Sequence, residues 1–330
     1  MNPTIYDVAK NAGVSIATVS RVLNKPQKVN EETRAAVLQA IDELGYTPKL
    51  EARTRALKES GRIGVITPFF TAPSFVQRLR GIASVLTPSD YELVIYTVDS
   101  FSRLQSYLET LPINGNLDGL IIVSLRFEDA LASRLVERKL QTVLIEYPQK
   151  LLSSVEIDDI AGGKMVAEYL LKKGHRTFGF LGDSDIPEYG IHPISHRLVG
   201  FRQGLNQAGI ELPEEQVYLV PYDMETTRQH TFRLLDSKTP PTAIFAATDL
   251  QAMGVLRAAH DRGLRLPEDL AVVGFDDLDM AEYVGLTTVR QHLDISGKLA
   301  VEILFTLLAE PSRPIQHVHL PLEIIERETA

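Results

Sequence analysis

Several polar or aromatic side chains stand at the ends of short apolar runs in this sequence. They are Asp99, Tyr147, Asp158, Asp183, Tyr222, Asp249 and Asp276. Such runs predict buried parallel strands, and the ligands of parallel sheets bind at the carboxyl ends of their strands. Carboxylates in that place accept hydrogen bonds from hydroxyl groups, or act as the acid and base of a hydrolase. The pattern therefore predicts either a polar binding cleft or a catalytic one.

No second catalytic signature accompanies these carboxylates. His192 and His196 lie four residues apart, but Pro193 stands between them and no glutamate follows His192, so they do not form a metalloprotease pair. His317 and His319 share one face of an expected strand, where packing is a commoner role than metal binding. The chain also lacks G-x-G-x-x-G after a strand, G-x-x-x-x-G-K-[ST] and G-x-S-x-G. We expect a binding protein that is not an enzyme and has no metal or cofactor.

Composition indicates a globular chain with more than one domain. It has 330 residues, of which 44% are hydrophobic and 23% charged, and one core rarely grows to that length. The absence of cysteine excludes disulfides, thiolate catalysis and cysteine zinc sites. No apolar run is long enough for a membrane span, and the first residues lack a secretory signal. We expect a cytoplasmic protein with no membrane partner.

The charge is unevenly distributed. Residues 1–62 hold ten Lys and Arg against seven Asp and Glu, although the whole chain has a net charge of -9. A small basic segment on a large acidic one suits a protein whose first part alone binds nucleic acid phosphates.

The first 46 residues predict three helices. Thr4 caps a helix from Ile5 to Ala12, Gly13 ends it, and Ser15 caps a second helix that buries Val19, Val22 and Leu23. A third helix runs from the N-cap Asn30 to the stop Gly45, with a buried stripe of Ala36, Val37, Ala40, Ile41 and Leu44. The short connection at Gly13 makes the first two helices a helix-turn-helix.

The other side of the second helix is suited to the major groove of DNA. Ile16, Ala17 and Thr18 are small enough to let the backbone approach base edges, and Arg21 can bind a guanine bidentately. Ser15, Thr18 and Ser20 can bond phosphates or bases. The alternative is a small helical domain that binds protein.

The segments IYDVAKNAGVSIATVSRVLN and VNEETRAAVLQAIDELGYTP resemble the DNA-binding head of the LacI/GalR (lactose-repressor/galactose-repressor) family of bacterial transcription regulators. By this resemblance Ile16, Ala17 and Arg21 read bases, while Thr4, Thr18, Ser20 and Asn24 hold phosphates. Tyr6 and Asn24 either contact DNA in this way or only pack and cap. The resemblance implies a repressor that binds double-stranded operator DNA. We expect a homodimer on a near-palindromic site, because one short recognition helix buries too little surface for specific affinity.

Residues 47–61 form a short polar linker that can become helical. In the family a leucine from this segment wedges into the minor groove. The matching position here is Arg55, and Leu57 follows two residues later. Either the wedge is shifted to Leu57, or Arg55 reads a narrow minor groove; a linker that contacts only phosphates is the third alternative.

Residues 62–330 predict two doubly wound lobes with parallel sheets. Eight apolar runs alternate with amphipathic stretches: IGVIT, ELVIYTV, DGLIIVS, TVLIEY, FGFLGD, VYLVPYD, AIFAATD and AVVGFDD. The first lobe is expected to comprise about 62–160 and 290–320, and the second about 161–289 and 321–330. Together with the helical head, this fold is an all-α domain joined to an α/β body.

The body resembles the family's effector domain, which is similar to periplasmic sugar-binding proteins of type I. The segments VEIDDIAGGKMVAEYLLKKGHRTFGFLGD, HRLVGFRQGL, ATDLQAMGVLRAAHDRGLRLPEDLAVVGFDD and LTTVRQHLDISGKLAVEIL carry the resemblance. It implies that Arg197 and Asp276 bind sugar hydroxyls and that Thr248 and Asp249 face the same cleft. Phe75 (after Ser74) and Phe275 would stack on a sugar, Asp158 would add an acceptor, and Tyr147, Tyr189 and His192 would lie nearby.

Structural roles for the same residues remain alternatives: Asp276 as a helix cap, Arg197 as an ion-pair partner and Phe75 as core. The expected function is repression of sugar-utilisation genes under control of a small carbohydrate. The other effectors left open are a purine, a nucleoside and a phosphorylated metabolite, and the other functions are a free-standing sugar receptor and a sugar-processing enzyme.

Overall fold

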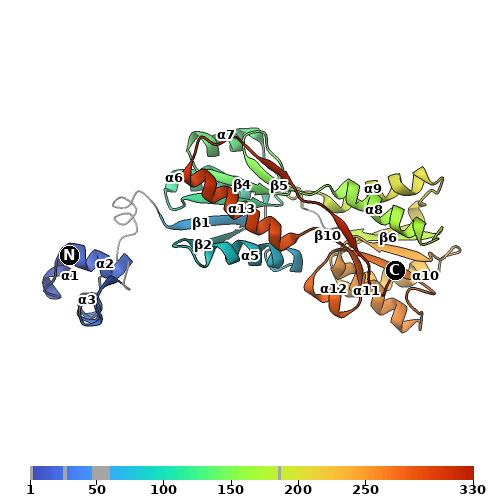
Figure 1. The fold of residues 1–330 in the computed structure, drawn as a ribbon, viewed down its shortest axis with the longest axis horizontal. Coiled ribbons are helices and arrows are strands. Elements are labelled where there is room, and N and C mark those ends of the chain that lie inside the picture. The colour runs from blue at the N-terminus through green and yellow to red at the C-terminus, as the bar shows by residue number, and fades with distance from the viewer. Residues whose placement is uncertain (1–2, 25–27, 47–59, 185–186) are drawn as a thin grey trace. The chain divides into compact units, whose positions relative to one another are not determined.

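A computed structural model describes residues 3–24, 28–46, 60–184 and 187–330 (Figure 1). Contacts within the chain divide it into two compact units, Met1–Ser60 and Gly61–Ala330, called the head and the body below. Within the described residues, none of the helices is both long and apolar enough to cross a bilayer.

The head folds as the three predicted helices, α1 (Ile5–Asn11), α2 (Ile16–Asn24) and α3 (Glu31–Leu44). Their shared core consists of Val8, Ala9, Val19, Val22, Val37 and Ala40. The first helix ends one residue earlier than expected, because Ala12 is its C-cap. Three short helices around six small apolar side chains make a compact platform for the exposed side of α2.

The turn between α1 and α2 depends on two predicted residues. Gly13 has φ +64°, a left-handed conformation that costs glycine little. The Ser15 hydroxyl accepts a hydrogen bond from the Thr18 N–H at 3.1 Å and so caps α2. At the start of α3, Asn30 Oδ1 accepts from the Thr33 N–H at 2.8 Å. Gly13 and Ser15 therefore shape the turn between α1 and α2, and Asn30 starts α3.

The first lobe of the body is a sheet covered on both faces. Its strand order is β11-β5-β4-β3-β1-β2, and all the pairs are parallel. The strands are β1 (Arg62–Thr67), β2 (Glu92–Thr97), β3 (Gly119–Val123), β4 (Gln141–Ile145), β5 (Ser153–Glu156) and β11 (His317–His319). One face packs on α5 (Pro73–Leu86) and α13 (Leu293–Ala309), and the other on α6 (Phe101–Asn114) and α7 (Asp129–Glu137). Figure 1 shows α13 beside α5, although it comes from the end of the chain.

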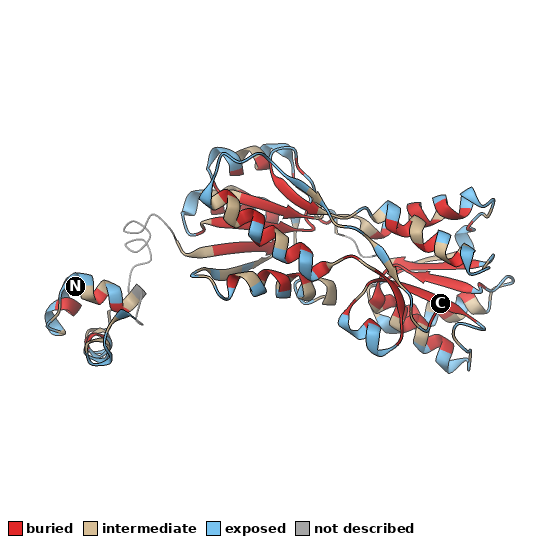
Figure 2. Cartoon of the chain, viewed as in Figure 1, coloured by how far each residue is buried: buried red, intermediate tan, exposed pale blue. Residues whose placement is uncertain are grey.

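The second lobe repeats this arrangement with the order β12-β10-β9-β8-β6-β7. The strands are β6 (Phe178–Asp183), β7 (Val217–Val220), β8 (Ala243–Ala246), β9 (Ala271–Asp276), β10 (Thr287–Arg290) and β12 (Glu323–Ile325), with the short helix η2 (Glu214–Gln216) before β7. One face is covered by α8 (Asp159–Lys172) and α9 (Pro193–Gln207), and the other by α10 (Met224–Leu235), α11 (Asp249–Asp261) and α12 (Asp279–Tyr283). In Figure 2 burial is concentrated on the strands and on the inward faces of these helices.

All eight apolar runs are strands, and the predicted fold class is confirmed. The short strands β5, β10 and β12 were not predicted, because SSVE, TTVR and EII are too short and too mixed to stand out from a loop. The last of them, β12, pairs antiparallel with β10. In the part of the body that the structure describes, the chain passes between the lobes three times, after β5, after β10 and after β11.

Two glycines bring α8 and α9 unusually close. A Cβ on Gly163 would lie 1.9 Å from the Arg197 carbonyl oxygen, and a Cβ on Gly200 would lie 1.9 Å from that of Ile160. Because no side chain larger than hydrogen fits, the two backbones touch. This contact holds Arg197 on α9 beside Asp159 at the start of α8.

Candidate functional site

A cavity of about 600 Å³ lies between the two lobes of the body. Its walls come from the carboxyl ends of strands in both sheets and from the loops that follow them, as expected for parallel sheets. The size falls within the range of small-molecule sites, which is roughly 300–1,000 Å³.

The lobes also touch directly beside this cavity. Leu125 and Gly190 form an antiparallel bridge, in which the Arg126 N–H donates to the Tyr189 carbonyl oxygen at 2.8 Å. On α5, Arg80 makes an ion pair of 2.7 Å with Asp279 of α12. The lobes are therefore closed on each other in this structure.

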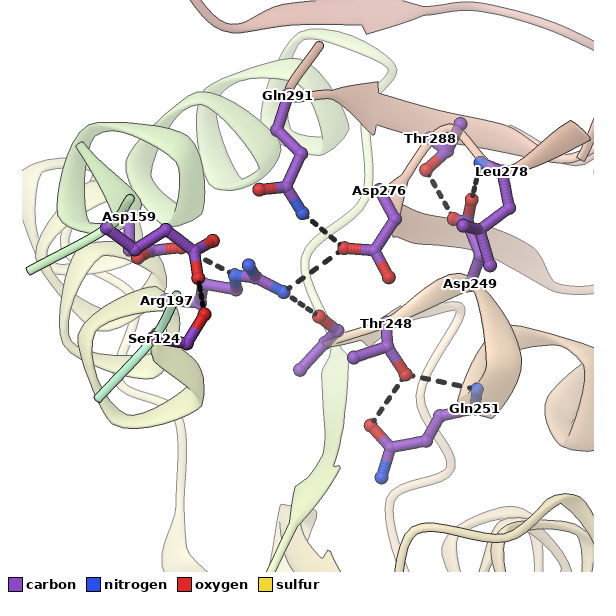
Figure 3. A network of polar contacts seen from close by, with 12 residues as sticks. Ser124, Asp159, Arg197, Thr248, Asp249, Gln251, Asp276, Leu278, Thr288 and Gln291 are labelled. Carbon is purple, nitrogen blue, oxygen red and sulfur yellow. Dashed lines mark hydrogen bonds and ion pairs between the residues drawn. The ribbon is translucent and has the colours of Figure 1, made fainter. Parts of the chain in front are cut away.

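Arg197 is the central cation of the second lobe's wall (Figure 3). Its Nε donates to Asp159 Oδ1 at 2.8 Å and its Nη1 donates to the Ala247 carbonyl oxygen at 2.7 Å. The same Nη1 lies 3.8 Å from Asp276 Oδ1, and the guanidinium stacks 3.7 Å from the centre of the Phe275 ring. Burial would lower the pKa of Arg197, but Asp159 and Asp276 outweigh it and hold that pKa above its ordinary value. Arg197 is thus both a structural ion-pair partner and part of the cavity wall.

Asp276 is almost fully buried at the end of β9 and lines the cavity. Gln291 Nε2 donates to its Oδ1 at 2.5 Å. Burial raises the pKa of Asp276, and the nearby Arg197 opposes this rise. It does not cap the next helix, whose N-cap is Leu278. The carboxylate therefore lies on the cavity wall, where it is hydrogen-bonded to Gln291.

The first lobe contributes a second buried ion pair. Arg78 of α5 donates to Glu146, which follows β4, and the Ser124 hydroxyl donates to the other oxygen of Glu146. Arg78 Nη2 also donates to Gln291 Oε1 at 3.3 Å. Because Gln291 also bonds Asp276, one chain of polar contacts crosses from the first lobe to the second.

Backbone strain is concentrated in the same place. Ser124 (φ +55°), Glu146 (φ +72°) and Asp276 (φ +129°) each follow or end a strand and line the cavity. Positive φ costs a residue other than glycine about 1–3 kcal/mol, and it occurs most often at functional sites. The strain turns three polar side chains towards one space.

Five of the eleven residues predicted for this site line the cavity: Ser74, Phe75, Arg197, Thr248 and Asp276. Thr248 caps α11 through a hydrogen bond from the Gln251 N–H at 3.2 Å. Phe75 is half-buried and packs on the first lobe's core as well as lining the cavity, so the packing role foreseen for it is present.

The other six lie elsewhere. Asp249 is fully buried and accepts hydrogen bonds from the Leu278 N–H at 2.7 Å and the Thr288 hydroxyl at 2.5 Å. Burial, and then the charge of Asp276, raises the pKa of Asp249. Phe275 is fully buried, so it reaches the cavity only through Arg197.

The remaining four have packing or capping roles. Asp158 accepts from the Ala161 N–H at 2.9 Å and caps α8. Tyr147 packs edge-on against Phe127, with 6.2 Å between ring centres, and Tyr189 packs on the first lobe's core. His192 is the N-cap of α9, which begins at Pro193.

Other lining residues were not predicted. They include Phe69, Phe70, Arg78, Ser124, Glu146 and Gln291. Asp183 and Tyr222, already noted at strand ends, also line the cavity. Burial, together with the charges of Asp276 and Asp183, raises the pKa of Tyr222, so its hydroxyl stays protonated. The wall thus offers carboxylate acceptors, guanidinium and hydroxyl donors, and aromatic faces.

In the head, the predicted DNA-reading residues lie on the exposed side of α2. Ile16, Ala17 and Arg21 are exposed, and Tyr6 of α1 is 68% exposed. Thr18 and Ser20 are half-buried, and the Thr18 hydroxyl lies 2.9 Å from that of Ser15. The Thr4 hydroxyl donates to Asp7 at 2.7 Å.

Asn24 is the last residue of α2, whereas the predicted Arg55 and Leu57 lie outside the described residues. Over the parts of the chain that the structure describes, no group of three His, Asp or Glu side chains is placed to hold a metal ion.

Comparison with known proteins gives matches over both units. Residues 4–49 match the family described as bacterial regulatory proteins, lacI family, and residues 167–330 match a periplasmic binding protein-like domain. The transcriptional regulator RegA of Clostridium saccharobutylicum is 33% identical over 100% of this chain and 99% of its own.

Two solved structures are similar over the same length. A complex of the transcriptional regulator CelR with cellobiose is 29% identical with a TM-score of 0.70, covering 99% of this chain and 100% of that one. A lac repressor dimer bound to operator and an anti-inducer is 26% identical with a TM-score of 0.77, covering 100% and 99%. With a helix-turn-helix head, two parallel-sheet lobes and relatives matched end to end, this chain belongs to the lacI family of DNA-binding bacterial transcription regulators.

Proposed function

We propose that this regulator represses sugar-utilisation genes and that a small carbohydrate in the cavity controls its hold on operator DNA. It acts as a homodimer on a near-palindromic site in the cytoplasm and releases its ligand unchanged. The observation that carries the proposal is the buried pair of Arg197 and Asp276, which offers a planar donor and a carboxylate acceptor on the same wall.

The charge of the cavity favours an uncharged, hydroxyl-rich ligand. Among the residues that the structure describes, four carboxylates line it, Asp99, Glu146, Asp183 and Asp276, against the guanidinium groups of Arg78 and Arg197. An excess of negative charge disfavours phosphorylated metabolites, because like charges repel strongly where water is scarce. Sugar hydroxyls both donate and accept, which suits a wall of mixed polarity, and the similar regulator CelR was solved with cellobiose.

The closed lobes supply a route from ligand to DNA. A ligand that bonds Asp276 of the second lobe and Arg78 or Glu146 of the first stabilises the closed arrangement relative to an open one. The three crossing segments transmit that closure to the start of β1, which the chain enters from the head. Because such coupling is reciprocal, operator DNA changes sugar affinity by the same factor.

The head recognises DNA by inserting α2 into the major groove, with Arg21 bonding a guanine edge. Two heads are needed because one short helix buries too little surface for specific affinity.

Arg21→Ala should weaken binding to the preferred operator by about 1–3 kcal/mol and relax specificity at one base position. Binding titrations on operator and on random DNA measure this. Arg34→Ala, which removes the same charge from α3, is the control and should lower both affinities equally. An equal loss on both DNAs with Arg21→Ala would show that Arg21 contacts only phosphate.

The effector proposal is tested with the full chain and a panel of sugars, purines, nucleosides and sugar phosphates. Melting temperature and retention on the gene's own upstream promoter DNA are measured for each compound, followed by analysis of the recovered ligand. A sugar that raises the melting temperature, changes retention and is recovered intact supports the proposal. A purine or sugar phosphate as the sole active compound contradicts it, and chemical conversion of the ligand would make the body an enzyme.

A further inference from the structure

We propose that the effector is a disaccharide or another O-glycoside with two rings, rather than a free monosaccharide. Its first unit binds the charged floor of the cavity, and its second stacks on Phe69 and Phe70 at the mouth. This inference rests on the proposed carbohydrate function and adds the size and polarity of the ligand.

The main support for this inference is the exposure of Phe69 and Phe70. Both line the cavity, yet they are 45% and 42% exposed. Adjacent exposed phenylalanines are unfavourable in water, since removing an aromatic side chain from water is favourable. Two of them facing a ligand cavity mark a surface that a ligand covers.

The floor has the opposite character. Arg78, Arg197 and Asp276 are each at most 4% exposed and are joined through Gln291. A hydroxyl-rich ring can add hydrogen bonds to these charged groups, but a hydrophobic group placed there would remove water from them and offer no partner in its place. The cavity therefore runs from a buried charged end to an exposed aromatic end, and a ligand complementary to both has two parts.

Phe69 is held in place rather than merely exposed. Its ring meets Phe75 edge-on, with 5.9 Å between centres and an angle of 76° between planes. Phe75 in turn packs on the first lobe's core, and the guanidinium of Arg78 lies 5.6 Å from its ring centre. The aromatic mouth is thus packed against Arg78, the part of the charged floor that the first lobe contributes.

The volume agrees with two units. At about 30 Å³ for each water-sized group, 600 Å³ holds roughly twenty such groups, well above the about twelve non-hydrogen atoms of one hexose. One face of a pyranose ring carries C–H groups, which are slightly positive and suit the negative face of an aromatic ring. A second sugar ring can therefore use Phe69 or Phe70 without any further polar partner.

The test is calorimetry of the full chain with single sugars (glucose, galactose, mannose, ribose) and two-ring sugars (cellobiose, maltose, lactose, melibiose). At least one two-ring sugar should bind at least tenfold more tightly than its own monosaccharides. Phe69→Ala and Phe70→Ala should each lower the affinity for that two-ring sugar by roughly tenfold. Each should change the affinity for any monosaccharide by less than about twofold. Phe101→Ala is the control, because Phe101 is 43% exposed and is not among the lining residues.

The outcomes separate the two proposals. The two-ring inference is overturned if a monosaccharide binds more tightly than every two-ring sugar, or if both phenylalanine variants keep the affinity of the unchanged protein. Either result leaves the proposal of a carbohydrate effector intact. Failure of every sugar to bind overturns both. Melting curves without ligand confirm that the variants are folded, since all three substitutions remove exposed rings.

Discussion

Replacing Arg197 by alanine should lower the free energy of unfolding of the body by about 3–5 kcal/mol, because it leaves buried carboxylates without their cation. The Arg197 guanidinium contacts Asp159 at 2.8 Å and Asp276 at 3.8 Å, and it covers the Phe275 ring. All the polar partners are at most about a tenth exposed, so water cannot replace the lost charge. Urea denaturation of the full chain, followed through the body, measures the loss.

Arg202→Ala is the matched control on the same helix. Arg202 pairs with Glu214 at 2.7 Å, but both side chains are exposed enough for solvent to screen the pair, and exposed pairs contribute about 0–1 kcal/mol. Equal losses in the two variants would mean that water reaches the Arg197 cluster and that its charge is not held in a dry site.

The loss of unfolding free energy caused by Arg197→Ala should be larger at neutral pH than at acidic pH. Burial raises the pKa of Asp159, and Arg197 opposes that rise, so removing the cation raises the pKa further. A folded-state pKa above the ordinary value of 3.8 means that the native state binds more protons than the unfolded state. The variant is therefore least stable near neutral pH, and its free energy of unfolding rises as the pH falls towards 3.8.

Local signals sufficed for the elements of this fold. Thr4, Gly13, Ser15 and Asn30 start and stop the helices of the head through short-range hydrogen bonds or a left-handed φ, which depend only on neighbours in sequence. The eight strands follow from continuous apolar runs. The strands missed, such as β12, become strands only by pairing with a distant segment.

The cavity residues were predicted less completely, because a position at a strand end specifies an edge of the sheet but not the direction in which the side chain points. Successive side chains of a strand point to opposite faces, so Asp276 meets the cavity while Phe275 enters the core. Thr248 caps α11 and faces the cavity, whereas Asp249, one residue later, turns inward.

Arg78 and Gln291 were missed for a different reason. Arg78 lies within an amphipathic helix, where an arginine is expected at the surface, yet it is 4% exposed. Gln291 lies in a segment that crosses between lobes, so its neighbours come from both sheets. Only the packed arrangement of α5, β9 and the crossing segment brings these side chains together.

Asp276→Ala should abolish the response to sugar while leaving operator binding without sugar intact. The substitution removes a buried carboxylate acceptor and leaves Arg197 and Gln291 without it, which should weaken sugar binding by about 2–5 kcal/mol. Binding to DNA is unaffected, because the head folds around its own core. Calorimetry with sugar, and operator titration with and without sugar, measure the two activities separately.

Asp277→Ala is the control, since it removes the same charge one residue later. Asp277 accepts from Arg290 Nε at 2.6 Å and from Arg327 Nη2 at 2.7 Å, and it is not among the residues lining the main cavity. It should lower the melting temperature but keep sugar affinity within about twofold, since only contacts outside that cavity are lost. Loss of the response in both variants would assign the effect to a weakened strand end, and a normal response in Asp276→Ala would remove Asp276 from the binding site.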